Sequence, residues 1–260
     1  MTRQTTIPAL LAVLILATSA ACIEEPEEVG SDRSESMMWG GSQVGVYVPP
    51  PARLLYAFDG NAHDSSPYRN NGWAVGVTNT TNRFGQANRA LEFSGTDMVW
   101  VPYEERFDMT NYTLSAFVYI SQHPPESGYH CDYYALIDKR SHFSFRLTQC
   151  GGATHMGLSL THMVADRPTS DGFHSSYAQI RRNEWTHVAV TRSNNTLTFY
   201  VNGRLTESKS NVSVARFSND NVLIGRTHYG KFFDGKMDDV RIHPRALSDS
   251  EVFAMYQQGN

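Results

Sequence analysis

Short runs of apolar or alternating residues, separated by turn signals, make up most of the sequence from residue 54 onward. None of them continues with the three- and four-residue spacing of a helix. Because a strand buries its apolar face by stacking against another sheet, such runs predict an all-β, two-sheet antiparallel sandwich. The runs are 54–58, 73–77, 90–93, 98–101, 112–120, 135–137, 143–147, 156–160, 185–191, 197–201, 222–224 and 237–242.

Residues 112–120 separate an apolar face from a mixed face. Alternation places Leu114, Ala116 and Val118 on one side, which we expect to meet the opposing sheet. Phe117 lies on the other side with a second aromatic and two hydroxyl side chains. We interpret this second face as a half-solvated surface, and the lining of a shallow groove is the alternative.

Two local signals predict a tight turn and a helix near the end of the chain. Asn202-Gly203 follows an apolar run and suits the positive φ angles of a type I′ hairpin. Ser248 and Glu251 have the spacing of a capping box, which predicts a short C-terminal helix that packs back on the sandwich.

Length and charge limit the number of domains and the class of partner. The 260 residues, 40% of them hydrophobic, suffice for one sizeable core. We therefore predict a signal peptide at 1–21, an acidic, Pro-rich disordered tether at 22–51 and one folded domain at 52–258. The formal charge is −4, with no basic block that would neutralise phosphates, so nucleic acid is not an expected partner.

The first residues have the pattern of an export signal. Arg3 precedes an apolar run at 7–17, and the small residues Ser19 and Ala21 stand before Cys22. Cys22 resembles the modified cysteine of bacterial lipoproteins, which implies a lipid anchor and a location facing the periplasm or cell surface. Ordinary cleavage after Ala21, with Cys22 as the first residue of a secreted chain, is the alternative.

Two further cysteines lie in the exported part of the chain. Cys131 and Cys150 are about 19 residues apart, a loop for which a disulfide adds roughly 3 kcal/mol in the chain-entropy model. A pair of buried free thiols is the alternative to this predicted disulfide. A metal pair is weaker because neither cysteine belongs to a Cys-x-x-Cys motif.

Ordered segments of the chain resemble the LamG-like jelly rolls of the concanavalin A-like lectin and glucanase group. The clearest is the closing segment, where Asp238 and Asp239 interrupt an apolar strand just before the helix start. Phe117 replaces the usual Trp of one strand, and His243 stands where Tyr or Trp is common. The resemblance implies a jelly roll with a short C-terminal helix, in a group whose members mostly bind rather than catalyse. Its segments are 56–61, 64–66, 84–87, 90–95, 112–118, 184–191, 197–203, 224–226 and 233–248.

The resemblance also implies a structural calcium ion between the opening and closing strands. The matching carboxylates are Asp59 and Asp238, and hard oxygen donors suit calcium. Alternation with Val240 and Ile242 places Asp238 inward, where an unpaired carboxylate is costly. The alternatives are an Asp238 paired with arginine or a hydrogen-bond donor, and an Asp59 that forms a turn before Gly60.

Aromatic residues near polar ones mark two candidate ligand loops. Tyr133 and Tyr134 belong to the first cluster, and Tyr229 and Phe232 to the second. Sugar sites combine an aromatic face with amide or carboxylate hydrogen bonds. Both clusters could equally anchor their loops.

Catalytic motifs of the related glucanases are missing from the sequence. No strand carries the Glu-x-Asp-x-x-Glu pattern that sets an acid and a nucleophile in one cleft. We therefore predict an exported, lipid-anchored, non-catalytic binding module for carbohydrate, with surface glycan as its partner. A protein-binding adhesion or structural domain is the first alternative, with a cell-surface protein as partner. A degenerate glycoside hydrolase is the second.

Overall fold

The computed structural model describes residues 51–124, 131–150, 155–164 and 167–258, with the backbone alone for 167–171. These ranges belong to one compact unit that spans residues 46–260. The predicted signal peptide, Cys22 and the tether lie outside the described residues, except for Pro51 at the end of the tether.

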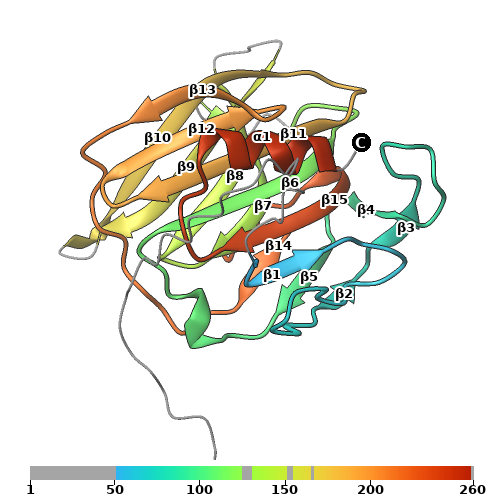
Figure 1. Ribbon diagram of the computed structural model, residues 1–260, viewed down its shortest axis with the longest axis horizontal. Helices are drawn as coiled ribbons and strands as arrows, with labels where there is room; N and C mark the ends of the chain where they lie inside the picture. Colours follow the sequence, from blue (N-terminus) through green and yellow to red (C-terminus); the bar gives the residue numbers. More distant parts are fainter. Residues whose placement is uncertain (1–50, 125–130, 151–154, 165–166, 259–260) are drawn as a thin grey trace, which may run out of the picture. The chain divides into compact units, whose positions relative to one another are not determined.

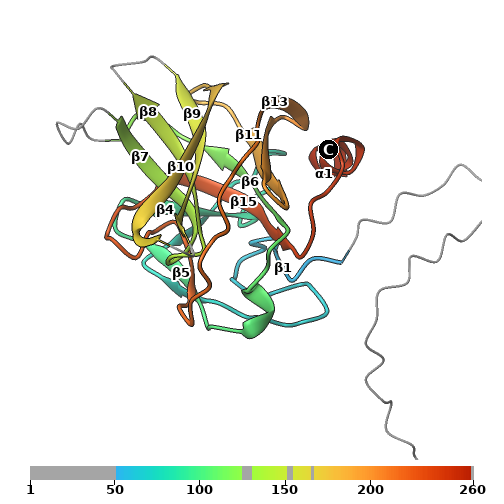
Figure 2. The same cartoon turned by 90° about the vertical axis from the view of Figure 1, so that its left-hand side faces the viewer.

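Sheet A and sheet B, both antiparallel, form the two layers of a sandwich (Figures 1 and 2). Sheet A has the strand order β13-β12-β11-β6-β15-β4-β3, and β1 pairs with β15 outside this path. Its strands are β1 (Leu54–Tyr56), β3 (Thr78–Thr80), β4 (Ala90–Ser94), β6 (Tyr112–Tyr119), β11 (Thr186–Ser193), β12 (Thr196–Val201), β13 (Arg204–Lys209) and β15 (Asp234–His243).

Sheet B has the strand order β10-β9-β8-β7-β14-β5-β2. Each predicted apolar run overlaps a strand of one of the two sheets, which confirms the all-β sandwich. The runs did not include β3, β10 or β13, because these strands are rich in hydroxyl and other polar residues. The strands of sheet B are β2 (Trp73–Val75), β5 (Met98–Val101), β7 (Cys131–Lys139), β8 (Phe143–Cys150), β9 (Met156–Val164), β10 (Arg167–Ile180) and β14 (Val222–Ile224).

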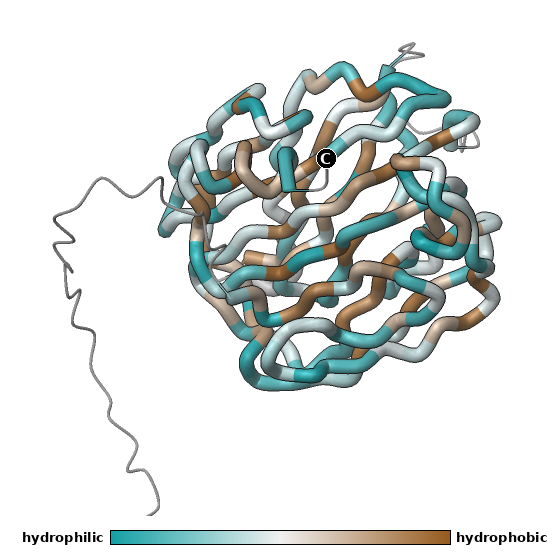
Figure 3. Tube along the Cα trace, turned by 45° about the vertical axis from the view of Figure 1, so that its right-hand side comes forward, coloured by the Kyte–Doolittle hydropathy of each residue, from teal (hydrophilic) through white to brown (hydrophobic). Residues whose placement is uncertain are grey.

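The core lies between the two sheets and consists of aliphatic and aromatic side chains from both. Leu114 and Val118 of β6 belong to it, as do Ile137, Phe145 and Leu160 of sheet B. This confirms that the aliphatic face of 112–120 meets the opposing sheet. Apolar and polar positions alternate along many strands in Figure 3, as expected for strands with one buried face.

The other face of β6 is covered rather than half-solvated, so that prediction is wrong. Thr113 and Phe117 are only 0% and 4% exposed. The helix α1 (Asp249–Gln258) lies on the side of sheet A that faces away from sheet B (Figure 2). Its Tyr256 ring stacks 6.3 Å from the ring of Phe117. The amphipathic helix supplies the cover that sequence alternation within one strand cannot reveal.

Local geometry confirms the capping box and the hairpin. The Ser248 backbone N–H donates to Glu251 Oε2 at 2.9 Å, and the Glu251 N–H donates to Ser248 Oγ at 3.4 Å. Asn202 and Gly203 have φ angles of 50° and 72°. A Cβ atom on Gly203 would lie 2.9 Å from the Cα of Phe253, so glycine also lets α1 approach the hairpin.

A short 3-10 turn, η1 (Glu105–Phe107), follows β5. Within the described ranges, no helix has both the length and the apolar character needed to cross a bilayer.

Candidate ligand-binding face

A bulge changes the direction of the acidic pair in the closing strand. The register of β15 against β6 shifts between Asp238 and Arg241, and Asp239 has a φ of 48°. As a result Met237 and Val240 both enter the core, and Asp238 points to the outer side of sheet A. The prediction that Asp238 points inward with Val240 is wrong, because the extra residue interrupts strict alternation.

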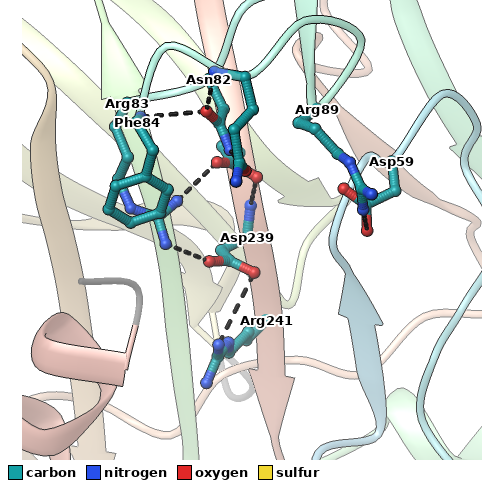
Figure 4. Close-up of polar contacts among 9 residues, drawn as sticks. Asp59, Asn82, Arg83, Phe84, Arg89, Asp239 and Arg241 are labelled. Carbon is teal, nitrogen blue, oxygen red and sulfur yellow. Dashed lines mark hydrogen bonds and ion pairs between the residues drawn. The ribbon is translucent and has the colours of Figure 1, made fainter.

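The guanidinium group of Arg83 binds both acids (Figure 4). Its Nη1 donates to Asp238 Oδ2 at 2.5 Å, and its Nη2 donates to Asp239 Oδ2 at 2.7 Å. The same group lies 3.8 Å from the centroid of the Phe117 ring. Burial, together with the charge of Asp239, raises the pKa of Asp238 to about 7, and Arg83 opposes this shift.

Asp59 lies near this pair but has its own arginine. Strand β1 is hydrogen-bonded to β15, with Tyr56 opposite Val240, so the opening and closing strands are neighbours. The charge of Asp59 contributes to the raised pKa of Asp238. Its Oδ2 is 2.6 Å from Arg89 Nη1 in a half-exposed ion pair.

These oxygens do not fit the predicted calcium ion in this arrangement. Calcium takes six to eight oxygen ligands. One carboxylate oxygen each of Asp59 and Asp238 instead faces an arginine. Among the described residues, no group of three His, Cys, Asp or Glu side chains is placed to hold a metal ion.

The strand register defines a row of side chains across the outer face of sheet B. Ile137, Phe145 and Ile224 are core residues, so the neighbours next to them in sequence face outward. This outer face is on the side away from α1 (Figure 2). In register across the seven strands, the row is Trp73, Trp100, Leu223, Asp138, Ser144, Thr161 and Phe173.

A stacked pair of indoles stands at one end of this row. The rings of Trp73 and Trp100 are 4.4 Å apart with an interplanar angle of 16°. Trp73 is 60% exposed, which is unusual for so large an apolar side chain. This pair is not visible in the sequence, because each Trp belongs to a different strand run and only the strand register makes them neighbours.

The segment that follows β14 crosses the same face and carries the second predicted cluster. Asp138 Oδ2 accepts the backbone N–H of His228 at 3.1 Å and lies 2.6 Å from its Nδ1. The guanidinium carbon of Arg226 lies 5.1 Å from the centroid of the Phe232 ring, and the Tyr229 side chain is 64% exposed. These contacts fix the segment over the centre of the sheet.

The first predicted cluster divides between the surface and the core. Tyr133 is half-buried and faces outward from β7, where the Arg146 guanidinium carbon lies 4.2 Å from its ring centroid. Tyr134 is 2% exposed and packs edge-on against Phe233 in the core. The prediction that Tyr134 contacts a ligand is therefore wrong. Tyr134 lies in strand β7 rather than in a loop, so its side chain points to the opposite side of the sheet from that of Tyr133.

The predicted disulfide joins Cys131 and Cys150, at the ends of β7 and β8. The two residues are direct partners in the register, with their Cα atoms 4.0 Å apart. A depression of about 300 Å³ begins next to Cys150, where the register between β9 and β10 shifts. Its walls include Thr148, Ser175 and Tyr177. Because it joins β7 to β8, the disulfide holds together the two strands that carry Tyr133 and Arg146.

A protein-family model matches residues 93–253, which is more than half of the chain, and its description is the concanavalin A-like lectin/glucanases superfamily. The chain belongs to this superfamily. In this concanavalin A-like domain the match includes Tyr133, Arg146 and the segment after β14, whereas Trp73 and Arg83 precede it.

Solved structures similar to this concanavalin A-like domain include binding domains of other proteins. Domain 4 of AbnA, an extracellular GH43 arabinanase from Geobacillus stearothermophilus solved with arabinotriose, is 19% identical with a TM-score of 0.64, and the match covers 81% of this chain and 100% of that one. The binding domain of Paraclostridial Mosquitocidal Protein 1 is 16% identical with a TM-score of 0.61. The binding domain of botulinum neurotoxin serotype D is 16% identical with a TM-score of 0.57.

Each of these toxin matches covers 80% of this chain and 52% of the toxin chain, so the present chain spans about half of their length. At these identities the likeness shows the fold alone. A search of curated proteins found no match.

Proposed function

We propose that this chain is an exported, non-catalytic carbohydrate-binding module, and that the outer face of sheet B is its binding surface. The observation that carries the proposal is the stacking of the exposed Trp73 on the half-buried Trp100, on a face away from α1. Apolar faces of sugar rings pack on aromatic side chains, and a few convergent polar groups fix their orientation. The half-buried Tyr133 supplies such a group on the same face.

The dimensions of the face suit an oligosaccharide better than a single sugar. Strands β2, β5, β14 and β7 are successive neighbours, and Tyr133 lies five residues along β7 from Asp138, which is in register with the Trp pair. Trp73 and Tyr133 are therefore separated by roughly 14 Å across the strands and by up to roughly 16 Å along them. That span corresponds to several sugar units in a chain. An arabinanase domain of similar fold was solved with a trisaccharide, which supports the proposal by analogy.

Replacing Trp73 with Ala is expected to raise the Kd for a bound glycan about tenfold, because an aromatic contact contributes roughly 1.5 kcal/mol. The side chain is 60% exposed on an outermost strand, so the fold should tolerate the change. A glycan array identifies the probe, and isothermal titration calorimetry gives its Kd for both proteins.

Phe253→Ala on α1 is the matched control, since Phe253 is an exposed ring on the opposite side of the domain. It should bind as tightly as the unchanged protein. Glycan binding that survives both Trp73→Ala and Tyr133→Ala would dismiss this face. A cell-surface protein recovered by crosslinking, with no glycan bound, would favour the adhesion alternative, and release of sugar from a labelled polysaccharide would favour the hydrolase.

We further propose that Cys22 carries a lipid anchor that holds the domain at a membrane, facing the periplasm or cell surface. The export pattern and the small residues before Cys22 support this proposal. Mass spectrometry of the N-terminal peptide from membrane fractions should show an acylated Cys22. A secreted chain with an unmodified Cys22 would contradict the anchor.

A further inference from the structure

Two cations share one aromatic ring on the outer face of sheet B. The guanidinium carbon of Arg146 lies 4.2 Å from the centroid of the Tyr133 ring, and Lys231 Nζ lies 5.9 Å from the same centroid. Arg146 Nε donates to Ser144 Oγ at 2.8 Å, which fixes the direction of the guanidinium group. Two like charges beside one ring repel each other, and an anion that contacts both would relieve that repulsion.

No carboxylate of the described part of the chain forms an ion pair with Arg146 or Lys231. The same holds for Arg140 and Arg226, which lie over Tyr229 and Phe232 on this face. By contrast, Arg83 on the other side of the sandwich pairs with two acids. Four cations of the proposed binding face therefore have no acidic partner among the described residues.

Asp138, the acid in the row across this face, already has hydrogen-bond partners. Asp138 is 2% exposed and accepts the backbone N–H of His228, with the His228 ring nitrogen 2.6 Å away. Asp138 also lines a small depression of about 30 Å³, whose other walls include Arg140, Arg146 and Tyr229. Its volume suits a group of a few atoms rather than a whole sugar ring.

We infer that the saccharide bound by this face is acidic, and that its oxyanion group binds Arg146 and Lys231 while its ring contacts Tyr133. Guanidinium groups bind carboxylates and other oxyanions through paired, charge-assisted hydrogen bonds. The stacked Trp pair would then hold a neutral part of the same oligosaccharide. This inference rests on the proposed function and adds the chemical class of the ligand to it.

The experiment compares three probes by isothermal titration calorimetry: trigalacturonate, its fully methyl-esterified form and a sulfated neutral trisaccharide. Trigalacturonate should bind at least tenfold more tightly than the ester, with a preference that weakens as salt is added. Arg146→Gln should remove at least tenfold of the affinity for trigalacturonate and leave the affinity for the ester unchanged. Lys231→Gln should have the same effect with a smaller amplitude.

Arg204→Gln is the matched control, because Arg204 is exposed on β13 in sheet A. It should bind all three probes as the unchanged protein does. The sulfated probe shows whether the anion that binds is a carboxylate or a sulfate. Binding of either acidic probe that depends on Arg146 supports the inference.

Equal binding of acid and ester, or an Arg146→Gln protein with unchanged preference, would overturn the acidic class and leave carbohydrate binding intact. If no saccharide binds, on the array or in solution, then both the inference and the proposed function fail.

Discussion

Replacing Arg83 with Met is expected to lower the free energy of unfolding by about 3–5 kcal/mol, since it removes one partner of a buried ion pair. The side chains of Arg83 and Asp238 are only 7% and 5% exposed. Met keeps much of the apolar contact with Phe117 but leaves Asp238 and Asp239 side by side without a cation. Chemical denaturation at pH 8 measures the change.

The pH dependence of this loss follows from the raised pKa of Asp238. In the folded protein this pKa is about 7, above the value near 4 of an unfolded chain. The folded state therefore binds a proton that the unfolded state has released, so the stability that Asp238 contributes is present below about pH 4 and is lost as pH rises through 7. Without Arg83 the pKa rises further. The variant should thus be destabilised more at pH 8 than at pH 5.

Two companion variants make this prediction specific. Arg83→Met combined with Asp238→Asn should recover part of the lost stability at pH 8, because the neutral amide removes the unpaired charge. Arg89→Met removes the half-exposed pair with Asp59 and should cost no more than about 1 kcal/mol. If the Arg83 and Arg89 variants lose equal free energies of unfolding, the buried Arg83 pair does not contribute more stability than the half-exposed Arg89 pair, and the prediction is wrong.

Calcium provides an independent check on the same cluster. If arginines balance these acids, calcium and a chelator should leave the melting temperature of the unchanged protein the same. A melting shift with calcium would instead support the metal ion that the family resemblance implies, and would require Arg83 or Arg89 to move away from its carboxylate.

Replacing Cys131 and Cys150 together with Ser is expected to lower the free energy of unfolding by roughly 3 kcal/mol. The disulfide closes a loop with a sequence separation of 19 residues, and the chain-entropy model assigns about that value to such a loop. Thermal or denaturant unfolding of the double variant and of the unchanged protein measures the difference.

The disulfide variant should also bind glycan more weakly, because the bond joins the strands that carry Tyr133 and Arg146. The unchanged protein treated with a reductant is the control and should lose a similar amount of stability. A double variant with the stability and Kd of the unchanged protein would show that the β7 and β8 pairing suffices without the bond.

Local sequence signals predicted much of the fold. Strand periodicity located the runs because one buried face imposes apolar alternation, as in Leu114, Ala116 and Val118. The Asn202-Gly203 hairpin and the cap at Ser248 depend on neighbouring residues, so they too were readable. The disulfide was predicted from spacing and from the export signal.

The binding face and the acidic cluster depended on contacts that are distant in sequence. The bulge at Asp239 reversed the predicted direction of Asp238, and no residue type near it marks that bulge. Arg83 reaches Asp238 across 155 positions. Trp73 meets Trp100 only through strand register. A sequence pattern identifies strands, but pairing between strands decides which side chains meet.

Binding of carbohydrate to the outer face of sheet B can be observed through the tryptophan indole N–H signals in an NMR titration with a glycan from the array. The signals can be assigned by single Trp→Phe variants. If this face binds the glycan, the signals of Trp73 and Trp100 shift with added glycan, whereas that of Trp185, which contacts Tyr119 in sheet A, stays in place. A saturating glycan that shifts Trp185 and leaves Trp73 and Trp100 unchanged would contradict binding at this face.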